Sequence, residues 1–338
     1  MSLILVQADA RALPLANESV QACITSPPYW GLRDYGTLEQ LGAEALHDCL
    51  GWATGECCGE CYVCHMVQVF REVRRVLRDD GVLWLNLGDS YYAPLKGSGG
   101  KNGRLGDSRC KSQESSAGSF FAPMRFSAHG LKPKDRVGIP ARVALALQAD
   151  GWWWRSECIW HKPNPMPSSV KDRPTDAHEM VYLFTKSARY YYDADAVREP
   201  HTMRPQRRPS GRPVDTTPRL AQPKQSWPTA AREKVGVDGH PGGRNRRTVW
   251  TIAPRPYHGA HFAAFPPDLV DPLVRCSTRP GDVVLDPFAG TGTTGMVAVK
   301  HGRRAVLCDV SRTYLTECAA ERTSEVQVDL LSAMGVRR

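Results

Sequence analysis

Two kinds of apolar pattern alternate along the chain: short apolar runs and segments in which apolar residues recur at helical spacing. Short apolar runs have the length of buried strands, at residues 3–7, 22–25, 82–87, 152–160, 179–184, 282–286 and 304–309. Between some of these runs the apolar positions recur at helical spacing, at residues 67–77, 139–149 and 293–301. Strands that alternate with helices predict an α/β fold built on a doubly wound, mostly parallel sheet.

Two stretches depart from this pattern. Residues 93–134 are rich in Gly, Ser and Lys, which predicts a mobile loop. Residues 198–256 hold ten of the 26 prolines, and no regular element is predicted there. We therefore expect a first half of one domain at 1–197, a separate segment at 198–256, and the second half of the domain at 257–338.

Charge separates the middle segment from the rest. The formal net charge is +9, and residues 198–255 contain 13 Lys and Arg against four Asp and Glu. A basic segment on a nearly neutral body favours a polyanionic partner. A solvated basic loop without a partner is the alternative.

Membrane and secretory classes are not favoured. No apolar run approaches the roughly 18 to 20 residues of a membrane span, and the first residues lack a signal-peptide layout. Six of the 11 cysteines are scattered singly, which is typical of a reducing compartment. We expect a cytoplasmic protein with no membrane partner.

A glycine-rich turn follows the predicted strand at 282–286. Gly290 and Gly292 let the backbone approach a ligand, and the helix that begins next offers free N–H groups. Asp309 ends the following strand 19 residues after Gly290, where nucleotide-binding folds hold ribose hydroxyls. The turn lacks the Gly-Lys-Ser/Thr of a P-loop and the third glycine of a dinucleotide fingerprint. A nucleotide-like cofactor is predicted here, with a tight turn that binds nothing as the alternative.

The tetrapeptide Ser26-Pro27-Pro28-Tyr29 comes directly after a predicted strand, where open α/β sheets bind ligands. Two prolines stiffen the backbone and remove two N–H donors, which leaves carbonyl acceptors. A base amino group is a poor nucleophile, because its lone pair is delocalised into the ring. The Ser26 hydroxyl and the Pro27 carbonyl would accept its hydrogens, and Tyr29 would stack on an extruded base. We expect these four residues to be catalytic.

The order of these motifs resembles the β-group DNA amino-methyltransferases, in which the catalytic motif comes first and the cofactor motif last. That family implies a Rossmann-like fold, the methyl donor S-adenosyl-L-methionine, and double-stranded DNA as substrate. Residues 70–77, 81–88, 160–165 and 178–179 also match it. Cofactor-binding residues carried over from the family are Asp9, Asp286, Phe288, Gly290, Gly292, Thr293, Asp309, His261 and Phe265.

The resemblance also bears on the target base. Ser-Pro-Pro-Tyr usually accompanies methylation of cytosine N4, whereas Asp/Asn-Pro-Pro-Tyr accompanies adenine N6. We expect a site-specific N4-cytosine enzyme, with an N6-adenine enzyme as the alternative. A C5-cytosine enzyme is excluded, because the chain has no Pro-Cys dipeptide to supply the nucleophile.

Five cysteines fall between residues 49 and 64, at spacings that can chelate a metal. The favoured set for a structural zinc ion is Cys49, Cys58, Cys61 and Cys64. Five reduced surface cysteines are the alternative.

The basic segment 198–256 is expected to recognise DNA, and Arg244, Arg246 and Arg247 are its first candidates for contact. A cognate restriction endonuclease, a monomer and a homodimer all remain open. A bacterial or phage origin with association to the nucleoid is expected. Two competing functions remain: an amino-methyltransferase acting on RNA or on a protein glutamine, and a non-catalytic zinc-stabilised DNA-binding protein.

Overall fold

The computed structural model describes residues 3–31, 41–42, 44, 58–92, 131–201, 240–254 and 265–324. It forms two compact units. The first unit comprises Met1–Asp193 and Thr248–Arg338, and the second comprises Ala194–Arg247. Most of the loop predicted at 93–134 lies outside the described residues.

A single eight-stranded sheet forms the centre of the first unit, in the order β1-β8-β7-β2-β3-β5-β4-β6. The strands are β1 (Leu3–Gln7), β2 (Val20–Thr25), β3 (Leu77–Leu87), β4 (Trp153–His161), β5 (His178–Thr185), β6 (Val249–Thr251), β7 (Val283–Asp286) and β8 (Arg304–Asp309). Only β5 runs against its neighbours, β3 and β4, so the sheet is mostly parallel as predicted.

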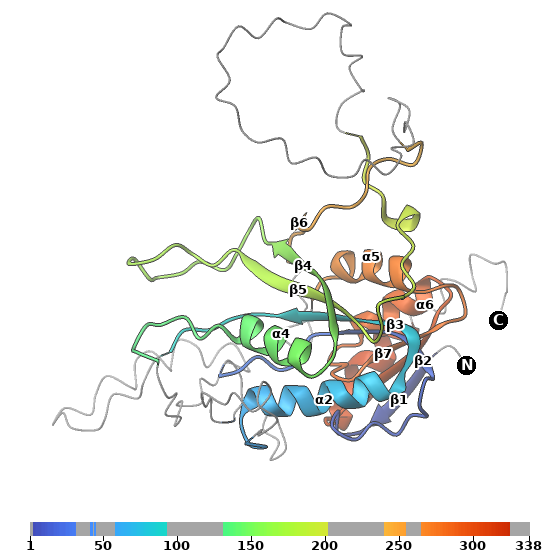
Figure 1. Ribbon diagram of the computed structural model, residues 1–338, viewed down its shortest axis with the longest axis horizontal. Coiled ribbons are helices and arrows are strands. Elements are labelled where there is room, and N and C mark those ends of the chain that lie inside the picture. Colours follow the sequence, from blue (N-terminus) through green and yellow to red (C-terminus); the bar gives the residue numbers. More distant parts are fainter. Residues whose placement is uncertain are drawn as a thin grey trace, which may run out of the picture. The chain divides into compact units, whose positions relative to one another are not determined.

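Helices cover both faces of this sheet (Figure 1). On one face α2 (Tyr62–Val76) packs beside α4 (Ile139–Ala149). On the other face α5 (Pro267–Ser277) packs beside α6 (Thr293–Lys300), and a short π-helical turn, η2 (Tyr314–Ala319), follows β8. The doubly wound arrangement predicted from the sequence is confirmed.

The central strands are continuous apolar runs in the sequence because both of their faces are buried. Every residue of β2 is buried, because helices cover both faces of the sheet. The amphipathic helix α2 contributes Met66, Phe70 and Val73 to the main core, which also contains residues of β2 and β3. This core holds the carboxyl end of β2 in place, from which the catalytic tetrapeptide extends.

Two predicted boundaries are wrong. The sequence predicts that residues 79–81 end a helix before a strand at 82, but the helix ends at Val76 and β3 begins at Leu77. Leu77 is already extended and pairs with Val20, and the register shifts before Ala22 pairs with Val82. The tertiary pairing therefore outweighs the local Asp-Asp-Gly signal.

The strand β6 lies inside residues 198–256, where no element is predicted. It has three residues, too few to show a period, and it forms only because Ile159 on β4 pairs with Val249. The described residues of the second unit form a short 3-10 turn, η1 (Asp195–Val197), and an isolated bridge between Glu199 and Arg244. Among the described residues, no helix is long and apolar enough to span a membrane.

Candidate active site

The strand order determines which residues meet at one edge of the sheet. Because β8, β7, β2 and β3 are parallel neighbours, their carboxyl ends lie side by side. The antiparallel strand β5 brings its first residues to this same edge, where Leu87 pairs with Met180 and Asn86 pairs with Val181. The edge therefore runs from Asp309 through Ser26 to Glu179.

Ser26 and Tyr29 join a hydrogen-bond network at this edge. The Ser26 hydroxyl donates to the Tyr29 oxygen over 3.2 Å, and the Tyr29 hydroxyl donates to Oε2 of Glu179 over 2.8 Å. Ser26 Oγ also accepts from Nδ2 of Asn86 over 3.5 Å, which leaves it a second lone pair for an external N–H donor. Ser26 Oγ can therefore accept a further hydrogen bond, and its role as the acceptor for a base amino group stays a prediction.

Glu179 is held by Lys162, whose ammonium donates to Oε1 of the carboxylate. Lys162 also lies 4.5 Å from the centre of the Trp160 ring, in a cation–π contact. Burial and the nearby Glu179 raise the pKa of Tyr29 well above its usual value. Tyr29 therefore stays protonated at neutral pH and keeps its proton on the Glu179 side.

Asn86 completes the network and was not predicted. Its Nδ2 donates to the Tyr29 oxygen over 2.6 Å and to Glu179 Oε2 over 2.9 Å. A carboxylate can only accept, so these contacts fix the orientation of the amide. Asn86 Oδ1 is buried and has no hydrogen-bond partner among the residues that the structure describes. It thus offers a second acceptor near Ser26.

A narrow pocket adjoins this acceptor. It is lined by side chains of β2, β3, β5 and α5, including Thr25, Asn86 and the predicted cofactor residue Phe265. The ring of Tyr29 packs against Gly88. A Cβ atom on Gly88 would lie 2.6 Å from Cε2 of Tyr29, so the ring needs a glycine there.

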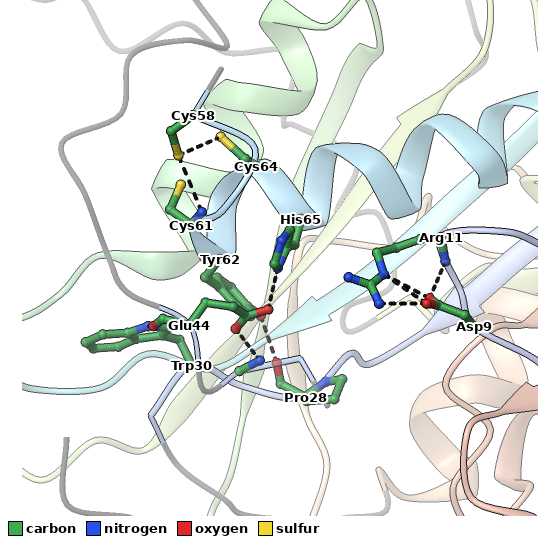
Figure 2. Close-up of polar contacts among 11 residues, drawn as sticks. Asp9, Arg11, Pro28, Trp30, Glu44, Cys58, Cys61, Tyr62, Cys64 and His65 are labelled. Atoms are coloured by element: carbon green, nitrogen blue, oxygen red, sulfur yellow. Dashed lines mark hydrogen bonds and ion pairs between the residues drawn. The ribbon is translucent and has the colours of Figure 1, made fainter. Parts of the chain in front are cut away.

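The Pro28 carbonyl is also held. The Tyr62 hydroxyl, from the first turn of α2, donates to the Pro28 oxygen over 2.8 Å (Figure 2). Only some of the carbonyls that the prolines leave unpaired are therefore open to a substrate. Nothing in the local sequence around Tyr62 indicates this contact.

The predicted cofactor turn has the expected backbone. Gly290 and Gly292 both have positive φ, 47° and 73°, and Gly292 caps the start of α6. Arg322, from the segment after η2, donates to the hydroxyls of Thr291 and Thr293. The Thr293 hydroxyl is therefore engaged within the turn, and Arg322 is a further residue that the sequence does not indicate.

Asp286 is buried and connects three elements through hydrogen bonds. Its Oδ1 accepts from the Thr25 hydroxyl over 2.7 Å and its Oδ2 from the Thr294 hydroxyl over 2.8 Å. Burial raises the pKa of Asp286 to about 6. Because the two oxygens already have donors, the structure favours a role in joining the catalytic strand to the cofactor turn. Phe288 follows and is partly buried against the main core.

Asp309 and Asp9 lie at the far side of the same edge. Asp309 accepts the N–H groups of Gly290 and Ser311 over 3.0 and 2.8 Å, and burial raises its pKa. Each carboxylate oxygen has a further lone pair, which suits the hydroxyl groups of a ribose. Asp9 is paired with Arg11 at 2.7 Å and is half-buried. His261 lies outside the described residues.

Three of the four predicted metal ligands are described. Cys58, Cys61 and Cys64 gather at the start of α2, with their sulfur atoms all within 4.8 Å of one another. Cys49 lies outside the described residues.

The predicted DNA-contacting arginines belong to the second unit. Arg244 and Arg247 both pair with Glu199, at 3.1 and 3.0 Å. Their side chains differ in exposure, at 29% for Arg244 and 65% for Arg247, so the two arginines are not equally accessible to a phosphate. The Nε atom of Arg246 is buried.

Comparison with known proteins decides the family. A family model described as DNA methylase, of the N6/N4 methyltransferase group, matches residues 20–321. The chain belongs to this DNA methylase family.

Relatives within the family cover nearly the whole chain. The type II methyltransferase M.XycI of Xanthomonas campestris pv. cyanopsidis is 41% identical over 91% of this chain and 82% of its own length. M.Cfr9I of Citrobacter freundii is 40% identical over 89% of this chain and 80% of its own. This DNA methylase is thus a DNA methyltransferase of the N4/N6 family, and S-adenosyl-L-methionine is its methyl donor.

Two solved structures share its fold. The cytosine-N4-specific PvuII DNA methyltransferase aligns with a TM-score of 0.56 and 17% identity, over 98% of this chain and 93% of that one. A Thermus thermophilus protein solved in complex with S-adenosyl-L-methionine aligns with a TM-score of 0.51 and 22% identity, over 95% and 93%. These likenesses confirm the Rossmann-like methyltransferase fold.

Proposed function

We propose that this DNA methylase methylates the N4 amino group of a cytosine extruded from duplex DNA. The pair of acceptors at the sheet edge, Ser26 Oγ and Asn86 Oδ1, supports an amino group as the target, and the Ser-Pro-Pro-Tyr form of residues 26–29 favours cytosine N4 over adenine N6. An exocyclic amino group has two hydrogens. Each acceptor would bind one of these hydrogens. The nitrogen lone pair would then be less delocalised into the ring and would point toward the methyl donor.

The order of residues along the edge supports this assignment. The cofactor turn after β7 lies on one side of β2, whereas Asn86 and Glu179 lie on the other. A base bound by Ser26 and Asn86 would therefore face the cofactor across the end of β2. Leaving a buried acceptor such as Asn86 Oδ1 without a donor costs about 1 to 3 kcal/mol, which a bound amino group would recover.

The chain's residues would also remove the proton that methylation releases. S-adenosyl-L-methionine supplies an electrophilic methyl group, and the nitrogen that takes it becomes positively charged. Ser26 could accept the N–H proton while passing its own to Tyr29, and Tyr29 could pass one to Glu179. The network ends on the Glu179 carboxylate, which can take up this proton.

The residues proposed to hold S-adenosyl-L-methionine are Asp9, Phe265, Phe288, Gly290, Gly292 and Asp309, with His261 proposed from the family alone. We also propose that residues 198–256 recognise DNA and that the enzyme works beside a cognate restriction endonuclease. The type II relatives favour that setting.

Nucleoside mass spectrometry tests the target base. DNA methylated by the purified enzyme with isotope-labelled cofactor should yield labelled N4-methylcytosine after digestion. Labelled N6-methyladenine would instead support the alternative target, and label in RNA or protein only would refute a DNA substrate. An Asn86→Ala variant should bind the cofactor as the parent does but methylate DNA more slowly. Unchanged kcat in that variant would remove Asn86 from the proposal.

A further inference from the structure

A cluster of three cysteines lies apart from the residues that the methyl transfer uses. Cys58, Cys61 and Cys64 come from the segment before α2 and from its first turn, and two of them are buried. Figure 2 shows their side chains together at the start of the helix.

The distances in this cluster fit a bound metal better than a disulfide. Cys58 Sγ and Cys64 Sγ are 3.7 Å apart. Thiolates on a tetrahedral zinc ion, each at about 2.3 Å from it, are separated by about 3.8 Å. Disulfide sulfurs are only about 2.05 Å apart.

The backbone also supports negative charge on the sulfurs. The N–H group of Cys61 donates to Cys58 Sγ over 3.4 Å. Cys61 is the N-cap residue of α2, and no side chain caps the helix there. The N-terminal end of a 15-residue helix carries partial positive charge, which partly offsets the burial that raises the pKa of the Cys61 thiol to about 11.

We propose that Cys58, Cys61 and Cys64 bind a structural zinc ion, and that this ion fixes the first turn of α2 against the catalytic tetrapeptide. Structural zinc is four-coordinate, so the three thiolates leave one position for a further ligand. The metal site is independent of the proposed base specificity.

The contact to the catalytic segment runs through two residues next to the ligands. Tyr62 follows Cys61 and donates to the Pro28 oxygen, and His65 follows Cys64 and contacts Oε1 of Glu44 at 2.8 Å. The other Glu44 oxygen accepts from the N–H group of Gly42 over 2.6 Å. In Figure 2 Tyr62 and His65 extend from the first turn of α2 toward Pro28 and Glu44.

Gly42 in turn packs against the tetrapeptide. Its N–H group donates to Glu44, its carbonyl accepts from Gly31, and a Cβ atom there would lie 3.0 Å from the Tyr29 carbonyl oxygen. A shift of the first turn of α2 would therefore disturb both sides of residues 26–31. The zinc ion would hold this turn where a side-chain cap is absent.

Elemental analysis of the full chain, purified under reducing conditions and dialysed with and without added Zn²⁺, tests the metal site. We expect about one zinc per chain in the parent, as in structural sites. Cys61→Ser and Cys64→Ser should lose it, whereas Cys158→Ser should keep it, because Cys158 is buried on β4 outside the cluster. Zinc-free parent protein after incubation with Zn²⁺, or zinc retained by Cys61→Ser, would overturn the proposal.

Cobalt substitution keeps the test valid if the buried variants fail to fold. Cys58 is exposed, so Cys58→Ser should fold. Co²⁺ in the parent should give intense tetrahedral bands and thiolate-to-metal charge transfer, and Cys58→Ser should weaken the charge-transfer band. An octahedral Co²⁺ spectrum, or one that Cys58→Ser does not change, would contradict ligation by this cluster.

Hydrogen exchange tests the link to the catalytic segment. Removing zinc should speed amide exchange in the first turns of α2 and in the peptide that contains Gly31. Tyr62→Phe should keep its zinc while exchange rises in the Gly31 peptide alone. If zinc removal leaves exchange of both peptides unchanged, the ion does not fix this turn.

Discussion

At the scale of single residues, the active site depends on which atom donates each hydrogen bond. Glu179 can only accept, and this one constraint orients both the Tyr29 hydroxyl and the Asn86 amide. The Tyr29 oxygen then accepts from Ser26, whose own oxygen accepts from Asn86 Nδ2 over 3.5 Å and keeps a second lone pair. Asp286 acts similarly on the other side of β2, by accepting from Thr25 and Thr294.

Ser26→Ala tests the acceptor role directly. Turnover should fall about 100-fold, by analogy with the loss of one positioned hydrogen-bonding group in an active site. Affinity for S-adenosyl-L-methionine should not change, because the hydroxyl is bound to Tyr29 and not to the cofactor turn. Steady-state kinetics and cofactor titration measure the two effects. Ser19→Ala, which removes a hydroxyl bonded only to the nearby Ala16 carbonyl, is the matched control. Loss of cofactor binding in Ser26→Ala would refute the assignment.

Asp286 should give the fold a measurable pH dependence. Burial raises its folded-state pKa to about 6, above its usual value, so the folded state binds the proton more tightly than the unfolded state. Its contribution to stability is therefore full below pH about 4 and is lost as the pH rises through about 6. The difference should be about 2 to 3 kcal/mol for a shift of two pKa units.

Denaturation of the parent and of Asp286→Asn at several pH values isolates this contribution, since other carboxylates titrate equally in both. As the pH falls from 7 to 4, the parent should gain stability relative to the variant. A constant difference between the two proteins across this range would show that Asp286 does not titrate there.

At the scale of elements, the catalytic edge depends on how closely strand ends approach the Pro-Pro turn. Gly88 follows β3 directly and lies under the Tyr29 ring, while Lys162 follows β4 and reaches Glu179 on β5. Three strands thus position one tyrosine. Its orientation is a property of the strand pairing and of no single segment.

Gly88→Ala should displace the Tyr29 ring, because the added methyl group would lie 2.6 Å from Cε2. We expect kcat for DNA methylation to fall about tenfold or more, since small misplacements of catalytic groups are costly. The melting temperature should change little, because the ring can rotate away. Kinetics and a thermal melt separate these effects, and full activity in Gly88→Ala would show that the ring position is not critical.

At the scale of the whole molecule, charge is divided between the two units. The excess of basic residues lies in 198–255, which contains most of the second unit, whereas the methylation residues lie in the first. The paired Arg244 and Arg247 share one carboxylate, Glu199. DNA affinity and methyl transfer should therefore be separable by mutation.

Replacing Arg244, Arg246 and Arg247 together by alanine should weaken DNA binding while cofactor affinity is unchanged. Removing each arginine that binds a phosphate should make the log–log salt dependence of binding shallower by about one unit. Fluorescence anisotropy over a range of salt concentrations measures the slope. Glu199→Gln is the control of opposite sign, because it removes the carboxylate that competes with phosphate for two of these arginines. A triple variant that binds and methylates DNA like the parent at every salt concentration would refute the role of this segment.

The sequence by itself determined the features that depend on local order. The tetrapeptide at residues 26–29, the glycine turn after β7 and Asp309 were predicted in place, because each follows a short buried strand with a clear apolar run. The alternation of strands and helices was sufficient for the fold class. The cysteine spacing likewise placed three thiols together, since they lie within seven residues at the start of one helix.

Only the tertiary structure decided which distant residues complete the site. Asn86 and Glu179 lie on β3 and β5, Lys162 follows β4, and the three meet because β5 runs antiparallel between β3 and β4. Strand direction is set by the pairing of whole strands, which no local pattern specifies. The contacts of Tyr62 with Pro28 and of Arg322 with the glycine turn span 34 and 31 residues for the same reason. Such contacts form when packed elements bring side chains together, so the chain's pattern identifies the chemistry and the packing determines its geometry.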